Sequence, residues 1–264
     1  MIGEGLVRRL LTVRYGETIY DKINLFITAL LRSFPGPLRH TKLWEIISGP
    51  PFNKWRVNIN GVRYVLNDWT GVLVVTPWFE PWMWRFLRPK RGDVFLDVGA
   101  HVGKYALQVA RIVGNEGLVI AIEPMPEHFK ELVRNIRLNG FRNVIPLNIA
   151  AWKEEAILKL YLSGSGRHSV KYNHGLGFIK VKARPLDAVL RELNVNCVNW
   201  IKIDVEGAEY EVLLGLSNTL RRCSPKVIIE IWNENKQATL KLMKDLGFKE
   251  HEINGSNGYY YFEK

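Results

Sequence analysis

Asp93-Val94-Phe95-Leu96-Asp97-Val98-Gly99-Ala100-His101-Val102-Gly103 is the stretch of this 264-residue chain that decides its fold. Val94–Val98 is an apolar run rich in β-forming residues, which is typical of a strand buried on both faces. Two glycines follow it, and the next run, Lys104–Val113, has the spacing of a helix. A strand, a glycine turn and a helix N-terminus together form a backbone pocket for a polar ligand.

The spacing of the two glycines indicates which ligand this turn binds. The dinucleotide fingerprint G-x-G-x-x-G does not fit, because His101 and Lys104 occupy its second and third glycine positions. An acidic residue near the strand's end, Asp97, with glycines two and six positions later, instead resembles motif I of the S-adenosylmethionine (SAM) methyltransferases. The resemblance implies that Asp97 holds the ammonium end of SAM and that a Cβ at Gly99 would collide with the ligand. It also implies a cofactor-binding turn made of Gly99, Ala100, His101 and Gly103.

Two later strand ends are expected to complete the SAM site. Glu123 ends the strand expected over residues 118–123, about 20 residues after the glycine turn, where a carboxylate accepts hydrogen bonds from both ribose hydroxyls. The third strand is expected over 144–148. By resemblance Asn148, Ala150 and Ala151 lie against adenine, with Ala151 limited to backbone contact because its side chain has no polar atom.

The second motif with chemical content is Ile201-Lys202-Ile203-Asp204-Val205-Glu206-Gly207-Ala208-Glu209. It puts Asp204 and Glu206 at the carboxyl end of a strand, where open α/β sheets bind their ligands. Methyl transfer to a hydroxyl requires aligned reacting atoms and a group that takes the hydroxyl proton. Asp204 is therefore a candidate base, and Asp204 with Glu206 could instead bind a divalent cation. Glu209 is more simply explained as a favourable charge in the first turn of a helix.

Together these stretches resemble the FkbM-family methyltransferases. The segments that match, in that family's order, are Asp97-Val98-Gly99-Ala100-His101-Val102-Gly103, Ile122-Glu123-Pro124, Leu186-Asp187, Ile203-Asp204-Val205-Glu206-Gly207-Ala208-Glu209 and Ile229-Glu230-Ile231. By resemblance the protein is an enzyme that uses SAM to methylate a hydroxyl of a saccharide, a glycoconjugate or another small molecule. His101 departs from the family, which often has Asn there.

Two further features near the expected site have open interpretations. Glu230 could face the substrate or be a buried acid whose hydrogen bonds are satisfied. The polar loop 163–169, with Arg167 and His168, could cover the acceptor or be a solvated hairpin loop.

From residue 94 onward strand-like and helix-like runs alternate, which predicts a mainly parallel, doubly wound α/β sheet. Strands are expected at 94–98, 118–123, 144–148, 200–204 and 227–231, with a terminal hairpin in 248–262 and a β-rich insert at 156–162 and 178–183. The resemblance implies the seven-stranded, Rossmann-like sheet of class I SAM methyltransferases, with strand order 3-2-1-4-5-7-6. We expect this methyltransferase domain over 92–264 and a helical plus β-hairpin appendage over 1–91.

The appendage has its own patterns. Ile19, Ile23, Phe26, Ile27 and Leu30 recur at helical spacing within 6–34. Such a basic amphipathic helix packs on the core or against a second copy, covers the substrate cleft, or lies on a membrane. Asn60-Gly61 within 55–66 predicts a β-hairpin, and 72–75 is expected to add a strand.

The appendage is also basic and aromatic. Residues 1–93 hold 14 Lys and Arg against 7 Asp and Glu, and thus most of the net charge of +11. Such a bias favours a polyanion or an anionic membrane, although solvated basic side chains explain it equally well. Aromatic residues between 78 and 86, interleaved with arginines, could stack on bases or cement the appendage onto the core.

RNA methylation is therefore the main alternative function. A non-catalytic binding module with the SAM fold is another. Against RNA, no Asn-Pro-Pro-Tyr-like motif follows the fourth strand, where two carboxylates stand instead.

The two cysteines, Cys197 and Cys223, lack metal-ligand spacing. We therefore expect reduced thiols, buried or half-buried, in a cytoplasmic protein that could touch a membrane peripherally through residues 6–34. No signal peptide is expected, because Arg8 and Arg9 precede no clean apolar stretch. The apolar-rich run 23–31 is too short to span a bilayer.

Overall fold

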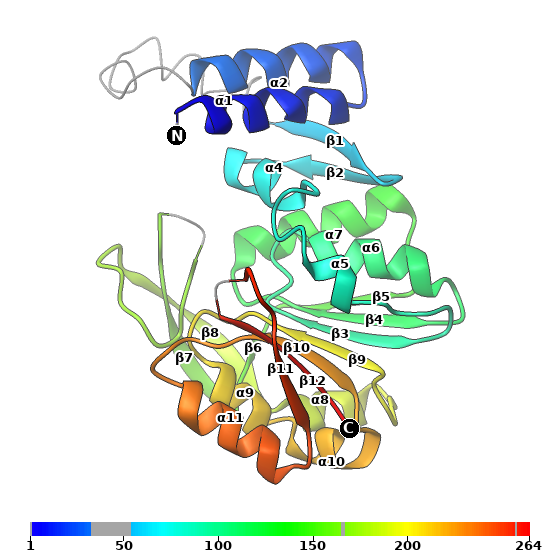
Figure 1. The fold of residues 1–264 in the computed structure, drawn as a ribbon, viewed down its shortest axis with the longest axis vertical. Helices are drawn as coiled ribbons and strands as arrows, with labels where there is room; N and C mark the ends of the chain where they lie inside the picture. Colours follow the sequence, from blue (N-terminus) through cyan, green and yellow to red (C-terminus); the bar gives the residue numbers. More distant parts are fainter. Residues whose placement is uncertain (1, 33–53, 165–166, 257) are drawn as a thin grey trace. The chain divides into compact units, whose positions relative to one another are not determined.

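The computed structural model describes the whole chain except residues 1, 33–53, 165–166 and 257 (Figure 1). The chain divides into two compact units. The first comprises Met1–Phe79 with Arg137–Gly140, and the second comprises Glu80–Ile136 with Phe141–Lys264. Residues 80–91 thus group with the second unit, which holds both motifs of the expected site.

The second unit is built on a mixed seven-stranded sheet (Figure 1). From one edge to the other, its strands are β5 (Val144–Leu147), β4 (Leu118–Ile122), β3 (Val94–Val98), β9 (Trp200–Ile203), β10 (Lys226–Glu230), β12 (Tyr259–Glu263) and β11 (Lys249–Glu252). The first five run parallel, and β12 pairs antiparallel with both of its neighbours. The predicted α/β fold with a seven-stranded methyltransferase-type sheet is confirmed.

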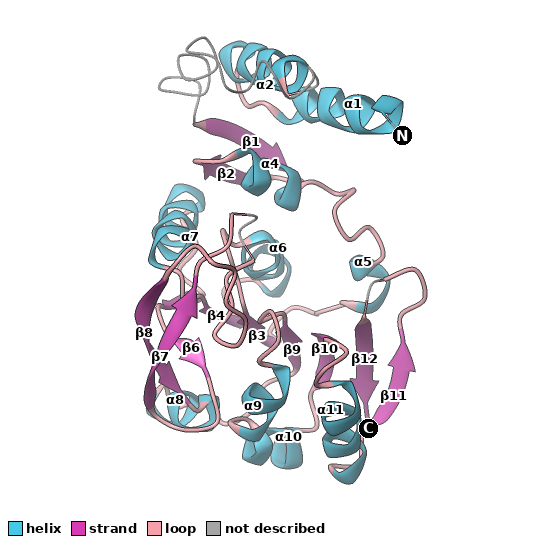
Figure 2. Ribbon diagram, turned by 90° about the vertical axis from the view of Figure 1, so that its left-hand side faces the viewer, coloured by secondary structure: helices cyan, strands magenta, loops and turns pink. Residues whose placement is uncertain are grey.

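Helices cover both faces of this sheet (Figure 2). On one face lie α6 (Lys104–Val113) and α7 (Pro126–Asn139), and on the other lie α8 (Leu186–Glu192), α9 (Glu209–Leu214), α10 (Ser217–Cys223) and α11 (Lys236–Asp245). This two-sided cover explains why β3 is apolar without alternation: its last four residues are all buried. A short helix, α5 (Met83–Phe86), precedes β3.

The β-rich insert forms a separate three-stranded sheet. Its order is β6 (Ala150–Ala151), β8 (Phe178–Arg184) and β7 (Ala156–Tyr161), with β7 and β8 antiparallel. The polar loop between β7 and β8 returns to the carboxyl ends of the main strands, since the Ser169 hydroxyl donates to the Glu206 carbonyl at 2.6 Å.

The first unit consists of α1 (Ile2–Leu11), the 3-10 turn η1 (Thr12–Tyr15), α2 (Ile19–Leu31), a β-hairpin and α4 (Trp69–Val75). The predicted hairpin is confirmed as β1 (Trp55–Ile59) and β2 (Val62–Leu66), with Asn60 and Gly61 both at positive φ. The strand expected at 72–75 is wrong. Asp68 instead caps a helix there, because its carboxylate accepts the Gly71 N–H at 2.6 Å.

The prediction of reduced cysteines is also wrong. Cys197 and Cys223 form a disulfide that joins the segment before β9 to the last residue of α10. Cys197 is exposed, so the bond lies at the surface. The sequence offered no signal for it, because the two positions are 26 residues apart and become neighbours only in the folded chain.

Candidate active site

Asp97 lies at the centre of the expected cofactor turn. Its side chain is 1% exposed, and neither carboxylate oxygen meets hydrogen-bond geometry with any described residue. Burial raises the pKa of Asp97 to about 6, although the Lys202 ammonium and then the Ala106 N–H at the start of α6 favour the ionised form. A buried carboxylate without a partner indicates a missing donor, and the ammonium group of SAM is a donor of the right charge.

The glycines of the turn are required by the protein itself. Gly99 has a φ of 85°, and a Cβ there would lie 1.8 Å from the carbonyl oxygen of Asp204. The structure thus puts protein backbone where the sequence predicted a ligand. Gly103 has a φ of 97°, and its Cβ would lie 2.8 Å from Leu132 Cδ1. Because Gly99 lies this close to the Asp204 carbonyl, the turn after β3 touches the turn after β9. The expected cofactor turn and the Asp204 motif therefore form one site.

Glu123 closes the other side of the turn. Its Oε2 accepts the His101 N–H at 2.7 Å and its Oε1 accepts the Met125 N–H at 2.9 Å. Burial nevertheless raises the pKa of Glu123 to about 7. Each carboxylate oxygen retains a lone pair, so the side chain could still accept the ribose hydroxyls predicted for it.

His101 departs from the family residue in a way that the structure explains. Its φ of 52° lies in the left-handed region that Asn and His tolerate better than most side chains. Burial lowers the pKa of His101 to about 4, so the imidazole is neutral. The centre of its ring lies 3.9 Å from the ring centre of His128, and the ring centre of His128 lies 5.2 Å from that of His168. His101 Nδ1 is buried without a partner among the described residues, a second group that a cofactor could satisfy.

The other residues that were predicted to contact SAM make structural contacts within the protein. Ala100 is buried in the turn itself. Asn148 donates from Nδ2 to the carbonyls of Glu123 and Pro124, at 2.8 and 3.1 Å, and so fixes the backbone behind Glu123. Ala150 and Ala151 are buried in β6, where they pair with β8. Their adenine contacts stay predictions.

Three carboxylates meet at the ends of β9 and β10. Asp204, Glu206 and Glu230 each offer an oxygen within 4.8 Å of the others. Burial raises the pKa of Asp204, but the Lys202 ammonium and hydrogen bonds from Glu230, Lys202 and Tyr259 more than offset it, so the pKa falls below its ordinary value. Burial and the Asp204 charge raise the pKa of Glu230 to about 9. Glu230 is thus the protonated partner that donates to an ionised Asp204.

Glu206 has a different environment from its two neighbours. It sits at a φ of 53° in the tight turn after β9, before α9 begins. Burial and then the Asp204 charge raise the pKa of Glu206 to about 7, although Arg167 pairs with it at 3.1 Å. Glu209 supports this turn: it accepts the Gly207 N–H at 2.7 Å and the Asn235 amide at 3.2 Å. Glu209 therefore has a structural role: it holds the turn by these hydrogen bonds, in addition to any favourable charge at the start of α9.

Several buried polar residues beneath this cluster escaped the sequence patterns. Lys202 Nζ lies 3.0 Å from Asp204 Oδ2, and the Tyr259 hydroxyl contacts the same oxygen at 3.0 Å. The Tyr259 hydroxyl also lies 2.6 Å from Glu80 Oε1, and Tyr105 donates to Glu80. Lys104 Nζ lies 4.0 Å from the same carboxylate. Only Lys202 carried a signal, as a charged residue within an apolar strand; the others are distant in the sequence.

Aromatic and basic side chains stand beside the three carboxylates. Tyr172 stacks on Trp232 with ring centres 4.8 Å apart and planes at 22°. The Arg167 guanidinium lies over the Trp232 ring at 5.4 Å while it pairs with Glu206. A Cβ at Gly207 would lie 2.2 Å from the Tyr172 ring, so the tyrosine rests directly on the turn. The loop between β7 and β8 therefore packs against the turn after β9 and is not merely solvated.

The three carboxylates fit a divalent cation by ligand type and spacing. Each already has a partner, however: Lys202 for Asp204, Arg167 for Glu206, and a shared hydrogen bond between Asp204 and Glu230. A cation would have to displace Arg167 and the Glu230 proton. Metal dependence stays a prediction, which turnover after exhaustive chelation, with and without added Mg²⁺, would test.

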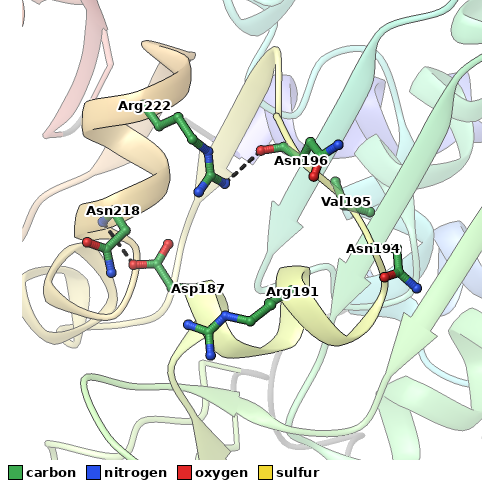
Figure 3. Close-up of a pocket in the computed structure, with 7 residues that line it drawn as sticks. All are labelled: Asp187, Arg191, Asn194, Val195, Asn196, Asn218 and Arg222. Atoms are coloured by element: carbon green, nitrogen blue, oxygen red, sulfur yellow. Dashed lines mark hydrogen bonds between the residues drawn. The ribbon is translucent and has the colours of Figure 1, made fainter.

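Asp187, which also matches the family pattern, lies elsewhere. It lines a cavity of about 210 Å³ together with Arg191, Asn194, Val195, Asn196, Asn218 and Arg222 (Figure 3). Residues 194–196 precede β9 and Asp204 follows it, so this cavity lies at the opposite end of that strand from Asp204. The Asp187 carboxylate accepts the N–H groups of Asn218 and Thr219, both at 2.9 Å, and so caps the start of α10. Its role is structural.

Comparisons with known proteins agree with this geometry. The model of the methyltransferase FkbM domain matches residues 97–250. The hexuronic acid methyltransferase AglP of Haloferax volcanii is 30% identical over 173 residues, which cover 59% of this chain and 69% of that protein. Methyltransferase 1 of Beauveria bassiana is 29% identical over 185 residues, which cover 61% of this chain and 74% of that protein. The crystal structure of an FkbM methyltransferase from Methylobacillus flagellatus has a similar fold, with a TM-score of 0.50 at 13% identity over 99% of this chain and 59% of the other.

Proposed function

Because this chain belongs to the FkbM family of SAM-dependent methyltransferases, we propose that it transfers the SAM methyl group to a hydroxyl of a saccharide or glycoconjugate. One observation carries the proposal. The expected cofactor turn touches the Asp204 backbone at Gly99, so a methyl donor bound at that turn would share one site with the carboxylates at the ends of β9 and β10. Acidic groups at that place suit a hydroxyl acceptor, which must lose a proton as it is methylated.

Bound SAM would supply a positively charged sulfonium whose methyl group accepts a nucleophile. Asp97, with its unpaired oxygens, would hold the cofactor's ammonium, and Glu123 would accept the ribose hydroxyls. Ionised carboxylates around a cationic cofactor also stabilise its binding electrostatically. Orientation of the acceptor hydroxyl in line with the methyl group is the remaining requirement, and the aromatic and basic side chains of the 163–177 loop and Trp232 would provide it.

Glu206 is a better candidate for the base than Asp204, the residue that the sequence indicated. Asp204 already accepts from Lys202, Tyr259 and Glu230 and has a lowered pKa, so it is a poor proton acceptor. The pKa of Glu206 is raised to about 7 by burial and by Asp204, which suits proton transfer near neutral pH. We therefore give Glu206 the proton of the acceptor hydroxyl and Asp204 the role of holding that acceptor in place.

An acidic sugar is the acceptor class that the site favours. The rings of Tyr172 and Trp232 present flat apolar surface of the kind on which sugar rings pack, and Arg167 supplies a cation beside them. AglP, the relative named above, acts on hexuronic acid. An acceptor carboxylate could take over Arg167 and release Glu206 from its ion pair, so that the base becomes competent when the acceptor binds.

RNA methylation receives less support. Three of the aromatic residues that could have stacked on bases pack within the second unit instead: Trp82 contacts Tyr259, Trp84 contacts Tyr105, and Phe86 contacts Tyr261.

Methyl transfer from tritiated SAM into a fractionated cell extract tests the acceptor class. Label in the glycan or glycolipid fraction supports the proposal, and acidic sugars should compete for it better than neutral ones. Label confined to RNA or protein would contradict the proposal, and a Glu206→Gln control identifies background transfer.

A further inference from the structure

Helix α2 of the first unit turns its apolar stripe outward. Of the positions that recur at helical spacing, Ile19 is 81% exposed, Ile23 53%, Phe26 48% and Leu30 42%, whereas Ile27 is half-buried. Tyr20, next to Ile19, is also exposed, at 54%. Packing of this pattern against the core of the protein was one of the interpretations that the sequence left open. Large apolar side chains held in water are costly, so a continuous stripe of them indicates a surface that is covered by something else.

The inward face of α2 explains why the helix cannot simply rotate. It buries Asp21, Asn24, Leu25, Thr28 and Ala29, a set that is more polar than the exposed stripe. Asn24 donates to the Lys54 carbonyl at 3.3 Å, and the Trp55 indole N–H donates to Thr28 Oγ1 at 3.2 Å. Thr18 and Asp21 also form a capping box at the helix start. These bonds lock the apolar stripe on the outside.

The neighbouring helix α1 adds to this apolar surface. It lies alongside α2 (Figure 1), and the Arg9 guanidinium donates to the Arg32 carbonyl at the end of α2. Val7 and Leu11 on α1 are also exposed. Among the residues that the structure describes, seven of the twelve exposed large apolar side chains lie on these two helices. We call these seven the α1–α2 stripe: Val7, Leu11, Ile19, Tyr20, Ile23, Phe26 and Leu30.

The charges around the α1–α2 stripe are positive. Arg8, Arg14 and Lys22 are exposed. The two acidic side chains between residues 6 and 32 are both engaged: Glu17 pairs with Arg63 at 2.6 Å, and Asp21 is buried in its capping box. A partner that meets this surface would therefore encounter cations beside apolar groups and little competing negative charge.

We propose that the α1–α2 stripe docks the protein on the surface of a membrane that contains anionic lipids. Exposed aliphatic and aromatic side chains enter the boundary between headgroups and acyl chains, and nearby Arg and Lys contact the anionic headgroups. The docking is peripheral. No helix of the described residues is long and apolar enough to cross a membrane, and the 13 residues of α2 lie in the plane of the interface.

Vesicle sedimentation tests this proposal with the full chain. Wild-type protein should pellet with phosphatidylcholine vesicles that contain phosphatidylglycerol, should bind pure phosphatidylcholine more weakly, and should be released as salt increases. The double variant Ile23→Ser/Phe26→Ser should bind anionic vesicles roughly 10- to 100-fold more weakly, because two partly exposed apolar side chains no longer enter the lipid.

A matched pair elsewhere supplies the control. Ile157 is 62% exposed and Phe178 is 45% exposed on the small sheet of the second unit, so Ile157→Ser/Phe178→Ser removes similar groups outside the stripe and should leave vesicle binding unchanged. Circular dichroism and melting curves should match wild type for both double variants. Equal losses for the two pairs would overturn the proposal. So would failure of the wild type to bind anionic vesicles at low salt, or a wild-type dimer that Ile23→Ser/Phe26→Ser converts to a monomer without any vesicle binding.

Discussion

Replacement of Gly99 by Ala tests the contact between the turn after β3 and the turn after β9. At the φ of 85° observed for Gly99, an alanine costs about 1–2 kcal/mol for the left-handed backbone alone. Its Cβ would also lie 1.8 Å from the Asp204 carbonyl oxygen. Backbone must move to relieve such a contact, which adds about 1–3 kcal/mol of overpacking. We expect Gly99→Ala to lose about 2–5 kcal/mol of unfolding free energy in urea.

Gly92→Ala is the matched control for this substitution. Gly92 has nearly the same φ, 83°, but nothing lies within 4 Å of its added Cβ. Only the backbone cost should remain, about 1–2 kcal/mol. Because relief of the clash moves Asp204, Gly99→Ala should also lose most methyl transfer, whereas Gly92→Ala should retain it. If the two variants lost equal stability and Gly99→Ala kept full turnover, the two turns would not be coupled as described.

Three other predictions concern pH, the buried lysine and the disulfide. Because burial raises the pKa of Glu123 to about 7 and that of Asp97 to about 6, protonation should weaken calorimetric SAM affinity as pH falls from about 8 to about 5, by up to about tenfold per unit for each group. Glu123→Gln should remove the part of this dependence centred near pH 7, and an unaltered profile would exclude Glu123 from the site. Lys202→Met leaves Asp204 buried without its cation and should cost about 3–5 kcal/mol in urea unfolding. Lys241→Met breaks an exposed pair with Asp245 and should leave the unfolding free energy nearly unchanged, so similar losses for the two variants would contradict the buried network. Unfolded, unreduced protein should show no free thiol, and Cys197→Ala/Cys223→Ala should cost about 2–4 kcal/mol; two titratable thiols in freshly purified protein would refute the bond.

The sequence was sufficient for the features whose physical cause is local. The apolar run of β3, the positive-φ positions of the Asn60-Gly61 hairpin and the alternation of strands with helices all depend on neighbouring residues, and the structure has them. The acids at the ends of β3, β4 and β9 could also be found, because parallel strands present their carboxyl ends at one edge of a sheet.

Features that depend on distant residues could not be found in this way. Tyr259 reaches Asp204 across 55 residues because β12 enters the sheet antiparallel beside β10, and Glu80 joins Tyr259 from the segment before β3. The need for glycine at 99 comes from the Asp204 backbone, more than 100 residues later. The stripe on α2 was visible as a pattern, but helical spacing does not say which face the rest of the protein covers.

Single-turnover methyl transfer by Glu206→Gln tests the central claim most directly. The protein is first saturated with tritiated SAM, whose affinity is measured by calorimetry, and is then mixed with the acceptor identified by labelling. The account predicts wild-type SAM affinity with transfer reduced at least about 100-fold, since a positioned base contributes about 10²–10⁴ to the rate. Transfer at the wild-type rate by this variant would contradict the assignment of the carboxylates at the ends of β9 and β10 to the acceptor hydroxyl.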